Sequence, residues 1–587
     1  MSSMATSRGR RYTAKTHGDI VVGGFKQLWH LNLLCDTRLR VQEETFHVHR
    51  CFLAASSQYF YSMFSEGVQE NAQDEVELCG VTAKGFEALL DYAYTGSVVI
   101  SATNLQEVLE AAAHLQYNEL QEFCAQYLKD EVNIDNCLQF LKMAEMYELA
   151  DCQKKTMHFI LQNFIPIAQN EDFQDISLEL LCAFLKDDAL RAESELEVFK
   201  VAIKWLNMKP ERRASAKQVL HLVRYGLIDT EQIDEVYTEP LMLADGCQDI
   251  LQASLSYHMK LFKQPIMDLP LSRMRDYEPS LLILGAGYLD NTLSTHMMAA
   301  RFKDGRLKDF ELLCPKKERQ YFACVAIVND FVYVVGGQNA MAGDGSNATS
   351  NVFRYNPRDD KWLQISSMTV PRTHFALVAL STCLIAVGGK HNRIALSSAE
   401  KYDFVTNQWI QIASLPATVF SHAGCANGNK VYISGGCCGD DFTDQMHCYD
   451  TGHDGWQLKS PMNQSRGYHV MISHENKILA CAGNTDAGDR RDVLNTESYD
   501  VELDQWTVLS PAPLGQSEAP AVKCANKVYV LGGYSWDIHS FQDIIQSFDL
   551  EKRVWEPTEV VLPEAMTGVV ATYVNLPVRM YNEHKAS

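Results

Sequence analysis

The sequence of 587 residues contains no run of about 18 apolar residues, the length that a membrane-spanning helix requires. Its first 15 residues are basic and polar and lack the apolar stretch of a secretory signal, so we expect neither a signal peptide nor a membrane span. Cationic residues are also in deficit: 52 Lys and Arg stand against 74 Asp and Glu, a formal net charge of −22. A charge of that sign argues against electrostatic binding of nucleic acid.

Metal and catalytic motifs are missing as well. The 17 cysteines follow no zinc-ligand spacing and no disulfide framework. The nearest candidate set is Cys35, His47, His49 and Cys51, and a buried histidine beside small apolar thiols explains it more simply than a metal. There is no phosphate-binding glycine loop, no His-Glu-x-x-His helix and no nucleophile elbow. We expect no metal, no cofactor and no enzymatic activity, and a cytoplasmic chain with reduced thiols; nuclear and cytoskeletal locations stay open.

What the sequence does contain is a short pattern that recurs six times in its last 300 residues, in which a glycine pair ends an apolar run. Four copies are complete: Gly336-Gly337, Gly388-Gly389, Gly435-Gly436 and Gly532-Gly533. Two are weaker: Gly285-Ala286 and Ala482-Gly483. The copies are 47 to 52 residues apart, and a fixed period of about that length built from short strands indicates a β-propeller.

Downstream of each of the last five copies, an aromatic residue is followed seven residues later by Trp. The pairs are Tyr355 and Trp362, Tyr402 and Trp409, Tyr449 and Trp456, Tyr499 and Trp506, and Phe548 and Trp555. Asn or Asp follows each aromatic and favours a turn, so we predict a tight hairpin with the two rings packed across it. Trp409 is expected to be buried. The first copy lacks the pair, and the strand-like segment 568–574 is predicted to complete that blade and close a ring of six.

The first half of the chain has helical and strand patterns of mixed type. Residues 1–16 are expected to be a disordered tail, and residues 17–34 have helical spacing weakened by Gly23 and Gly24, by about 1 kcal/mol each. Strands are predicted over 35–41 and 46–50, and a helix over 53–64. Residues 131–265 are almost wholly helical in pattern.

These segments resemble known domains in a known order. The run Phe46-His47-Val48-His49-Arg50, with Leu53-Ala54-Ala55-Ser56, Tyr59-Phe60, Met63-Phe64 and Tyr92-Ala93-Tyr94-Thr95-Gly96, resembles the BTB (POZ) domain, over residues 17–130. Trp205 followed by Met208-Lys209-Pro210-Glu211-Arg212-Arg213 resembles the BACK domain, over 131–265. The repeats resemble the kelch propeller, over 280–576, with a linker at 266–279 and a tail at 577–587. The chain is identified by this order as a member of the kelch-like family.

The resemblance implies a multidomain protein: an α/β BTB domain, an all-α BACK domain and an all-β six-bladed kelch propeller. It further implies a substrate-recognition adaptor of a cullin-3 RING E3 ubiquitin ligase that dimerises with a second copy through the first helix and strand of the BTB domain. Kelch-like adaptors carry a hydrophobic-x-Glu motif after the helix that ends in Met-Phe, and Phe64, Val68 and Glu70 fit that position. The alternative for this segment is a solvated loop.

By the same resemblance, loops on one propeller face bind the protein substrate. Segments that lead into the blades supply Arg319, Arg372, Arg466, Tyr468 and Ser517, and the loop after the last glycine pair supplies Tyr534 and Trp536. Arginine and large aromatic residues often carry interface energy. The alternative for Arg372 is an ion pair with an acid between blades.

Three other functions are alternatives to the adaptor. A cytoskeletal, actin-type scaffold would use the propeller without ubiquitination and would not bind cullin-3. A transcriptional BTB protein usually carries zinc fingers, and none is found in this sequence. A copper-oxidase propeller needs a clustered Tyr, Cys and His site in a secreted chain.

Overall fold

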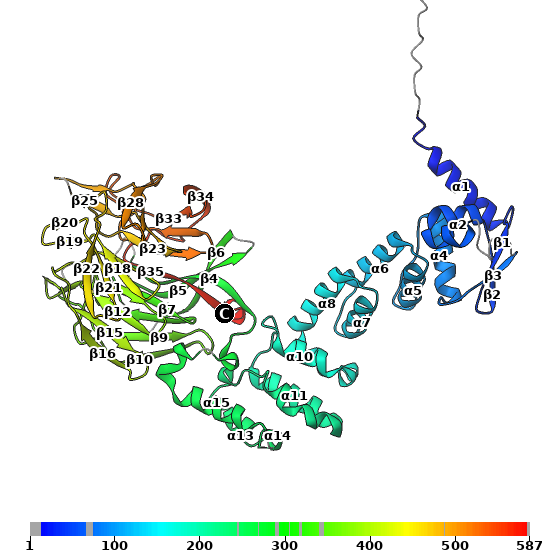
Figure 1. The fold of residues 1–587 in the computed structure, drawn as a ribbon, viewed down its shortest axis with the longest axis horizontal. Helices are drawn as coiled ribbons and strands as arrows, with labels where there is room; N and C mark the ends of the chain where they lie inside the picture. The colour runs from blue at the N-terminus through cyan, green and yellow to red at the C-terminus, as the bar shows by residue number, and fades with distance from the viewer. Residues whose placement is uncertain are drawn as a thin grey trace, which may run out of the picture. The chain divides into compact units, whose positions relative to one another are not determined.

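The computed structural model describes most of the chain in two compact units, Met1–Ser177 and Leu178–Ser587 (Figure 1). The described residues are 13–65, 74–243, 246–267, 269–287, 293–303, 306–315, 320–339, 345–486 and 488–583. Most of the predicted N-terminal tail, 1–16, therefore lies outside the described residues.

The first unit combines a small sheet with helices. Its elements are α1 (His17–His30), β1 (Thr37–Val41), β2 (Glu44–Val48), α2 (Arg50–Ser56), α3 (Gln58–Phe64), β3 (Glu75–Leu78), α4 (Ala83–Thr95), α5 (Leu105–His114), α6 (Asn118–Asp130), α7 (Cys137–Met146), α8 (Ala150–Gln162), α9 (Phe164–Ile167) and η2 (Glu171–Asp175). Strand β1 lies in the middle, antiparallel to β2 and parallel to β3. The single helix predicted over 53–64 is two helices, because Ser57 has an extended backbone and its side chain caps α3 by accepting the N–H of Phe60.

The histidine that the sequence placed near three other potential ligands is part of the core of this unit. His49 is 3 % exposed, and its ring nitrogens lie 3.0 Å from the Tyr94 hydroxyl and 3.0 Å from the Leu33 carbonyl oxygen. Helix α1 forms through Gly23 and Gly24 and packs one face on this core, with Trp29 stacked on Tyr94 at 4.6 Å. The expectation of a buried histidine is confirmed for His49.

The second unit begins with helices that lead to the propeller. They are α10 (Leu178–Lys186), α11 (Glu195–Met208), η3 (Pro210–Ser215), α12 (Ala216–Leu220), η4 (Tyr225–Leu227), α13 (Ile233–Tyr237), α14 (Pro240–Leu243), α15 (Gln248–Met259), η5 (Leu261–Ile266) and η6 (Pro270–Ser272). The predicted linker 266–279 is held tightly where it is described: buried Arg275 forms an ion pair of 2.9 Å with buried Glu195 of α11. A buried ion pair requires fixed geometry, so this segment differs from a loose linker.

The propeller consists of six four-stranded sheets, which confirms the predicted number of blades. Blade 1 orders β35 (Val570–Pro577), β4 (Tyr277–Gly287), β5 (Leu293–Lys303) and β6 (Arg306–Pro315) from the axis outward. Blade 2 has β7 (Cys324–Val328), β8 (Phe331–Val335), β9 (Val352–Asn356) and β10 (Lys361–Ile365). Blade 3 has β11 (Ala376–Ala379), β12 (Cys383–Val387), β15 (Ala399–Asp403) and β16 (Gln408–Ile412).

The remaining blades repeat this order. Blade 4 has β17 (Ala423–Asn427), β18 (Lys430–Ser434), β21 (Met446–Asp450) and β22 (Gly455–Lys459). Blade 5 has β23 (Val470–His474), β24 (Lys477–Cys481), β27 (Glu497–Asp500) and β28 (Gln505–Val508). Blade 6 has β29 (Ala521–Cys524), β30 (Lys527–Leu531), β33 (Ile544–Asp549) and β34 (Val554–Val561).

The ring is closed by the C-terminal strand, as predicted. Strand β35 pairs antiparallel with β4, so one blade contains strands from both ends of the propeller sequence (Figure 1). Each innermost strand contacts the next, and β35 contacts both β29 and β7, so the six form a complete circuit. The segment 577–587, expected to be a tail, instead contributes α16 (Arg579–Glu583), whose Met580 and Tyr581 are buried.

The aromatic and Trp of each pair lie directly opposite each other in the outer two strands, as expected. Tyr402 faces Trp409 with ring centroids 5.3 Å apart, and Trp409 is 6 % exposed. The indole Nε1–H donates to the Ser366 carbonyl oxygen of the preceding blade at 2.9 Å. Trp456, Trp506 and Trp555 likewise donate to the preceding blade, so these four tryptophans pack within their own hairpins and also join two blades.

The glycine pairs are required by backbone conformation and by space. Gly336 and Gly337 both have positive φ, and a Cβ on Gly337 would lie 2.6 Å from the Tyr321 carbonyl oxygen. The Gly337 N–H donates to the carbonyl oxygen of Arg372, in the segment that leads into the next blade, at 3.0 Å. The pair thus brings neighbouring blades into backbone contact.

Candidate partner-binding face of the propeller

The chain forms a short hairpin after the glycine pair in four of the blades. These hairpins are β13 (Lys390–His391) with β14 (Ile394–Ala395), β19 (Cys437–Cys438) with β20 (Asp441–Phe442), β25 (Asn484–Asp486) with β26 (Arg490–Asp492), and β31 (Tyr534–Ser535) with β32 (Ser540–Phe541). Backbone bridges join them to the segments that lead into the innermost strands, for example Thr373 to Lys390 and Ser517 to Tyr534. We call these hairpins and lead-in segments together the loop face.

Two arginines that the sequence suggested for partner binding are fully buried. Arg372 and Arg466 are each 0 % exposed, and each forms an ion pair of 2.6 Å with a buried carboxylate, Glu400 and Glu497 respectively. Arg372 also donates to the Gly388 carbonyl oxygen at 2.8 Å. Burial lowers the pKa of both guanidinium groups. The expectation that they contact a partner is therefore wrong, and the alternative ion pair is correct for Arg372.

The other predicted residues divide between buried and accessible positions. Ser517 is fully buried, and its backbone exchanges two 2.8 Å hydrogen bonds with Tyr534, so its expected partner contact is also wrong. Tyr468, Tyr534 and Trp536 are half-buried and lie on the loop face. Arg319 lies outside the described residues.

The lead-in segments contribute a ring of residues that the sequence reasoning largely missed. Its six members share a left-handed backbone conformation: Phe322, His374, Ser421, Tyr468, Glu518 and Gly568. Backbone hydrogen bonds join four of the successive pairs, for example from Tyr468 N–H to Ser421 O at 2.8 Å and from Glu518 N–H to Tyr468 O at 3.1 Å. Because they immediately precede the innermost strands, they surround the propeller axis, and we call them the axial ring.

The positions of the axial-ring residues in the sequence repeat at regular intervals. Its first five members follow one another at the same 47- to 52-residue steps as the glycine pairs. The residue types differ from copy to copy. Tyr468 alone among these residues was predicted from the sequence to contact a partner, because it is a large aromatic residue. Non-glycine residues with positive φ are uncommon, and five at one repeated position mark a conserved geometry of the fold rather than chance.

The axial ring combines aromatic surfaces with three titratable side chains, those of His374, Tyr468 and Glu518. Phe322 stacks on His374 at 4.3 Å, and His374 meets the edge of Tyr468 at 6.1 Å. Burial lowers the pKa of His374 to about 4 and raises the pKa of Tyr468 to about 12, so both are neutral at pH 7. Burial also raises the pKa of Glu518, whose carboxylate accepts from the Thr567 hydroxyl at 3.2 Å. Phe322, His374 and Tyr468 therefore present a neutral aromatic surface at the axis, with the half-buried Glu518 carboxyl group beside it.

One exposed arginine lies beside this surface. The guanidinium of Arg490 is centred 4.9 Å from the ring of Trp536 and 6.0 Å from that of Phe442, which belong to the hairpins of blades 6 and 4. Its charge reaches Tyr468 and Glu518 and lowers the pKa of each against the larger effect of burial. Trp536 packs edge-to-face on Tyr534 at 5.1 Å. Three neighbouring hairpins thus meet at this cation.

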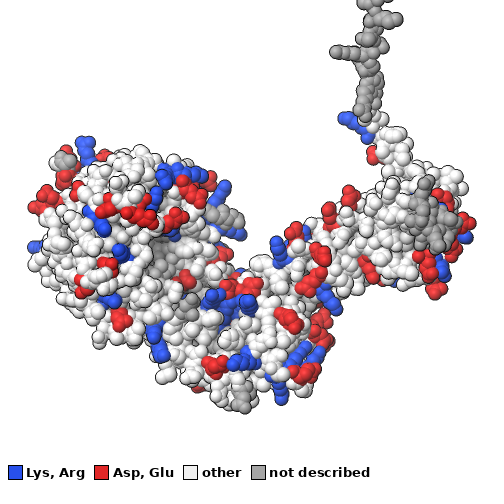
Figure 2. Space-filling view, in the orientation of Figure 1, with Lys and Arg blue, Asp and Glu red and all other residues white. Residues whose placement is uncertain are grey.

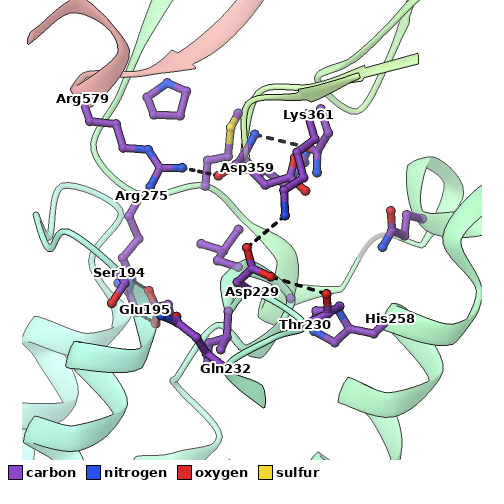
Figure 3. A pocket seen from close by; sticks show the side chains of 18 of the residues that line it. Ser194, Glu195, Asp229, Thr230, Gln232, His258, Arg275, Asp359, Lys361 and Arg579 are labelled. Atoms are coloured by element: carbon purple, nitrogen blue, oxygen red, sulfur yellow. Dashed lines mark hydrogen bonds and ion pairs between the residues drawn. The ribbon is translucent and has the colours of Figure 1, made fainter. Parts of the chain in front are cut away.

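A different cavity, of about 570 Å³, lies where the helices of the second unit meet blade 2 and α16 (Figure 3). Its charged groups pair with one another: Lys361 contacts Asp229 at 2.9 Å, and Arg191 contacts Asp276 at 2.5 Å. Hydrogen bonding to Lys361 lowers the pKa of Asp229. These ion pairs hold the helices of the second unit against the propeller, which is a structural role. The loop face is therefore the stronger candidate for partner binding.

The expected cullin contact is only partly covered by the structure. Phe64, at the end of α3, is half-buried, stacked 5.9 Å from Phe60 and 5.7 Å from the guanidinium of Arg50. Val68 and Glu70 lie outside the described residues.

Acidic and basic side chains are interspersed on the visible face of the propeller (Figure 2). Within the described residues, no group of three or more His, Cys, Asp or Glu is arranged to hold a metal ion, and no helix is long and apolar enough to cross a bilayer.

Comparison with known families gives matches in the expected order. A BTB/POZ domain model matches residues 25–131, and a BACK (BTB And C-terminal Kelch) model matches residues 137–238. The KLHDC2/KLHL20/DRC7 Kelch-repeats domain matches residues 321–520, and the Kelch motif matches residues 517–558.

Curated relatives match over nearly the whole chain. Kelch-like protein 26 of Danio rerio is 35% identical over 586 residues, covering 98% of this chain and 96% of the relative. Kelch-like protein 26 of Homo sapiens is 34% identical, with 96% and 93% covered. Kelch-like protein 36 of Bos taurus is 33% identical, with 94% and 91% covered. Identity of this extent, together with the matched domains and the six-bladed propeller, shows that the chain belongs to the kelch-like family of BTB, BACK and kelch-repeat proteins.

Proposed function

We propose that the chain is a substrate-recognition adaptor of a cullin-3 RING E3 ubiquitin ligase. In this function the BTB domain binds cullin-3 and the loop face of the propeller binds a protein substrate. The adaptor performs no covalent step, and it accelerates ubiquitin transfer by holding a substrate lysine near the charged ubiquitin carrier. We place this function in the cytoplasm.

The observation that carries the proposal is the combination of BTB and BACK domains with a propeller whose loop face exposes a cation among aromatic rings. The domain order is that of cullin-3 adaptors. Trp536 and Tyr468 are half-buried on the loop face, and Arg490 is exposed beside them. Arginine, tyrosine and tryptophan are the residue types enriched at interface hot spots.

We further propose that the protein is a homodimer through α1. No residue of α1 is buried within the chain. Phe25 and Trp29 face its own core, whereas Ile20 is 69% exposed and Leu34, just after the helix, is 79% exposed. Apolar side chains exposed together on one element are typical of a protein interface. A dimer would present two loop faces and raise the effective concentration of substrate sites.

Calorimetry with the purified cullin-3 N-terminal region tests the proposal. In the double variant, Val68→Ala truncates the predicted apolar anchor and Glu70→Lys reverses the charge of the predicted carboxylate contact. We expect each substitution to weaken cullin-3 binding by about 1–3 kcal/mol. The matched control is Val99→Ala with Glu43→Lys, the same chemistry at exposed positions of the same domain.

The results separate three situations. Weaker binding in the first variant with unchanged binding in the control supports the adaptor function and the motif. Wild-type affinity in both variants removes Val68 and Glu70 from the interface. If the wild-type chain does not bind cullin-3, the adaptor function is wrong and the cytoskeletal scaffold becomes the better hypothesis.

A further inference from the structure

We propose that Arg490 is the residue of the loop face that binds a carboxylate of the partner protein. The partner segment then carries one Asp or Glu side chain, with an apolar side chain close to it and neutral or basic residues around it. This inference rests on the proposed function, because it gives a chemical identity to the segment that the loop face would bind.

Arg490 is held in place without an acidic partner. Among the described residues, its guanidinium forms no ion pair, in contrast to Arg372 and Arg466. Its contacts are with the faces of Trp536 and Phe442, from two other blades. Stacking on a ring orders a guanidinium while leaving its edge N–H donors available, and those donors match the two oxygens of a carboxylate.

Two acids flank Arg490 in the hairpin: Asp489, the preceding residue, is exposed and forms no ion pair with Arg490 among the described residues, and Asp492 binds the hairpin of blade 6. The Asp492 carboxylate accepts from the Ser535 hydroxyl at 2.5 Å, the Trp536 N–H at 3.0 Å and the Asp537 N–H at 3.2 Å. These three bonds fix the blade 6 hairpin, including the tryptophan on which Arg490 stacks. The carboxylate that positions Trp536 therefore forms hydrogen bonds to blade 6 and, among the described residues, no ion pair with Arg490.

The surroundings of Arg490 define what accompanies the carboxylate. On the axial side, His374 and Tyr468 are uncharged at pH 7 and Phe322 is apolar, which suits an apolar side chain of the partner. The half-buried Glu518 is the acid of the axial ring, and it forms no ion pair with Arg490 among the described residues. On the outer side, the three hairpins carry exposed carboxylates that would repel further acids: Asp440, Asp441, Asp486, Asp489 and Asp537. A partner segment with a single acid directed to Arg490, flanked by neutral or basic residues, is complementary both to the axial ring and to the acidic hairpins.

The test is a selection of random 16-residue peptides, displayed on phage, against the purified full-length chain. Enriched peptides are synthesised, and their Kd is measured with wild type, Arg490→Ala and Arg491→Ala. Arg491 is the matched control, because it is the next residue of β26, is also exposed and, among the described residues, lies over neither the Trp536 nor the Phe442 ring. Melting temperatures of the variants check that the propeller stays folded.

We expect a consensus with one Asp or Glu at a fixed position. Arg490→Ala should weaken binding at least about 30-fold and Arg491→Ala less than about 3-fold, the first being the loss typical of a hot spot. A charge exchange sharpens the test: peptides with Lys at the acidic position should bind Arg490→Glu more tightly than they bind wild type.

Two results would overturn the inference in distinguishable ways. Enriched peptides that lack an acid, or that bind Arg490→Ala as tightly as wild type, overturn it and leave the proposed function standing. A selection that enriches no peptide at all contradicts both the inference and a peptide-binding role for the loop face.

Discussion

The interior of blade 5 and the hairpin on its loop face each contain an arginine, and the two have opposite surroundings. Arg466 is 0 % exposed and pairs with Glu497 on β27, at the centre of the blade. Arg490 is exposed and lies over aromatic rings from neighbouring blades. The same residue type therefore stabilises the fold at one position and is available to a partner at the other. The two arginines differ because the fold places the Glu497 carboxylate against Arg466 and, among the described residues, places none in an ion pair with Arg490.

The largest expected effect comes from breaking the blade interior at an aromatic pair. Trp409→Ala removes the ring that packs on Tyr402 and the hydrogen bond to Ser366 of the preceding blade. We expect the free energy of unfolding of the propeller to fall by about 3–5 kcal/mol. Thermal unfolding followed by tryptophan fluorescence measures this, and a wild-type transition would show that the periodic tryptophans do not hold the blades together.

The second effect comes from breaking the buried ion pair of blade 5. Arg466→Ala leaves the Glu497 carboxylate buried without its cation, and we expect a loss of about 3 kcal/mol, larger than for Arg491→Ala on the surface. Replacing both partners, Arg466→Met with Glu497→Leu, should cost less than Arg466→Ala alone. Equal melting temperatures for Arg466→Ala and wild type would return Arg466 to the list of candidate contact residues.

A third, smaller effect should appear as a pH dependence of the blade interior. His422 is 6% exposed, and burial lowers its pKa to about 3, below the ordinary value of 6.5. The folded state therefore disfavours the imidazolium. The free energy of unfolding is unaffected by His422 above pH 6.5, and protonation of His422 lowers it as the pH falls from 6.5 toward 3. For His422 alone the loss between pH 7 and pH 5 is at most about 2 kcal/mol.

The variant His422→Met should flatten this dependence. The His422 ring is buried and forms no hydrogen bond to another side chain among the described residues, so an apolar side chain of similar length is compatible with the site. The control is His453→Gln, because the His453 side chain is 86% exposed. Unfolding curves at pH 7 and pH 5 decide the matter; the same slope in His422→Met and wild type would mean that other groups govern the acid sensitivity.

The smallest expected effect on stability belongs to the loop face. Trp536→Ala removes a half-buried ring from the hairpin of blade 6, and we expect the free energy of unfolding to change by no more than about 0.5 kcal/mol. The same melting experiment measures it. Unfolding of the propeller in this variant would place Trp536 in the fold rather than in the partner site.

Much of the blade could be predicted because its determinants recur at fixed steps. The glycine pairs, the turn-forming Asn or Asp and the rings of Tyr402 and Trp409 repeat in residue type as well as in spacing. The closing strand could be predicted because the first copy lacked a partner. The motif within one repeat therefore predicts the structure of a single blade, and the number of repeats predicts a ring of six blades.

The site could be predicted less well, because its determinants come together only in the folded chain. Arg372 has the sequence context of a surface residue in a polar loop, but its partner Glu400 lies 28 residues further along, on β15 of the blade that Arg372 leads into. The axial ring repeats in backbone conformation but not in residue type, so Phe322, His374 and Glu518 gave no visible pattern. Arg490 depends on Trp536, which is on a different blade.

The central claim, that the blade interior maintains the fold while the loop face recognises a partner, is tested most directly by affinity capture from cells. Wild type and Trp536→Ala are expressed at equal levels, and captured proteins are quantified relative to cullin-3 recovered in the same sample. We predict equal cullin-3 recovery, with at least one protein captured by wild type reduced about 30-fold in the variant. Equal recovery of every captured protein in both samples would contradict the claim.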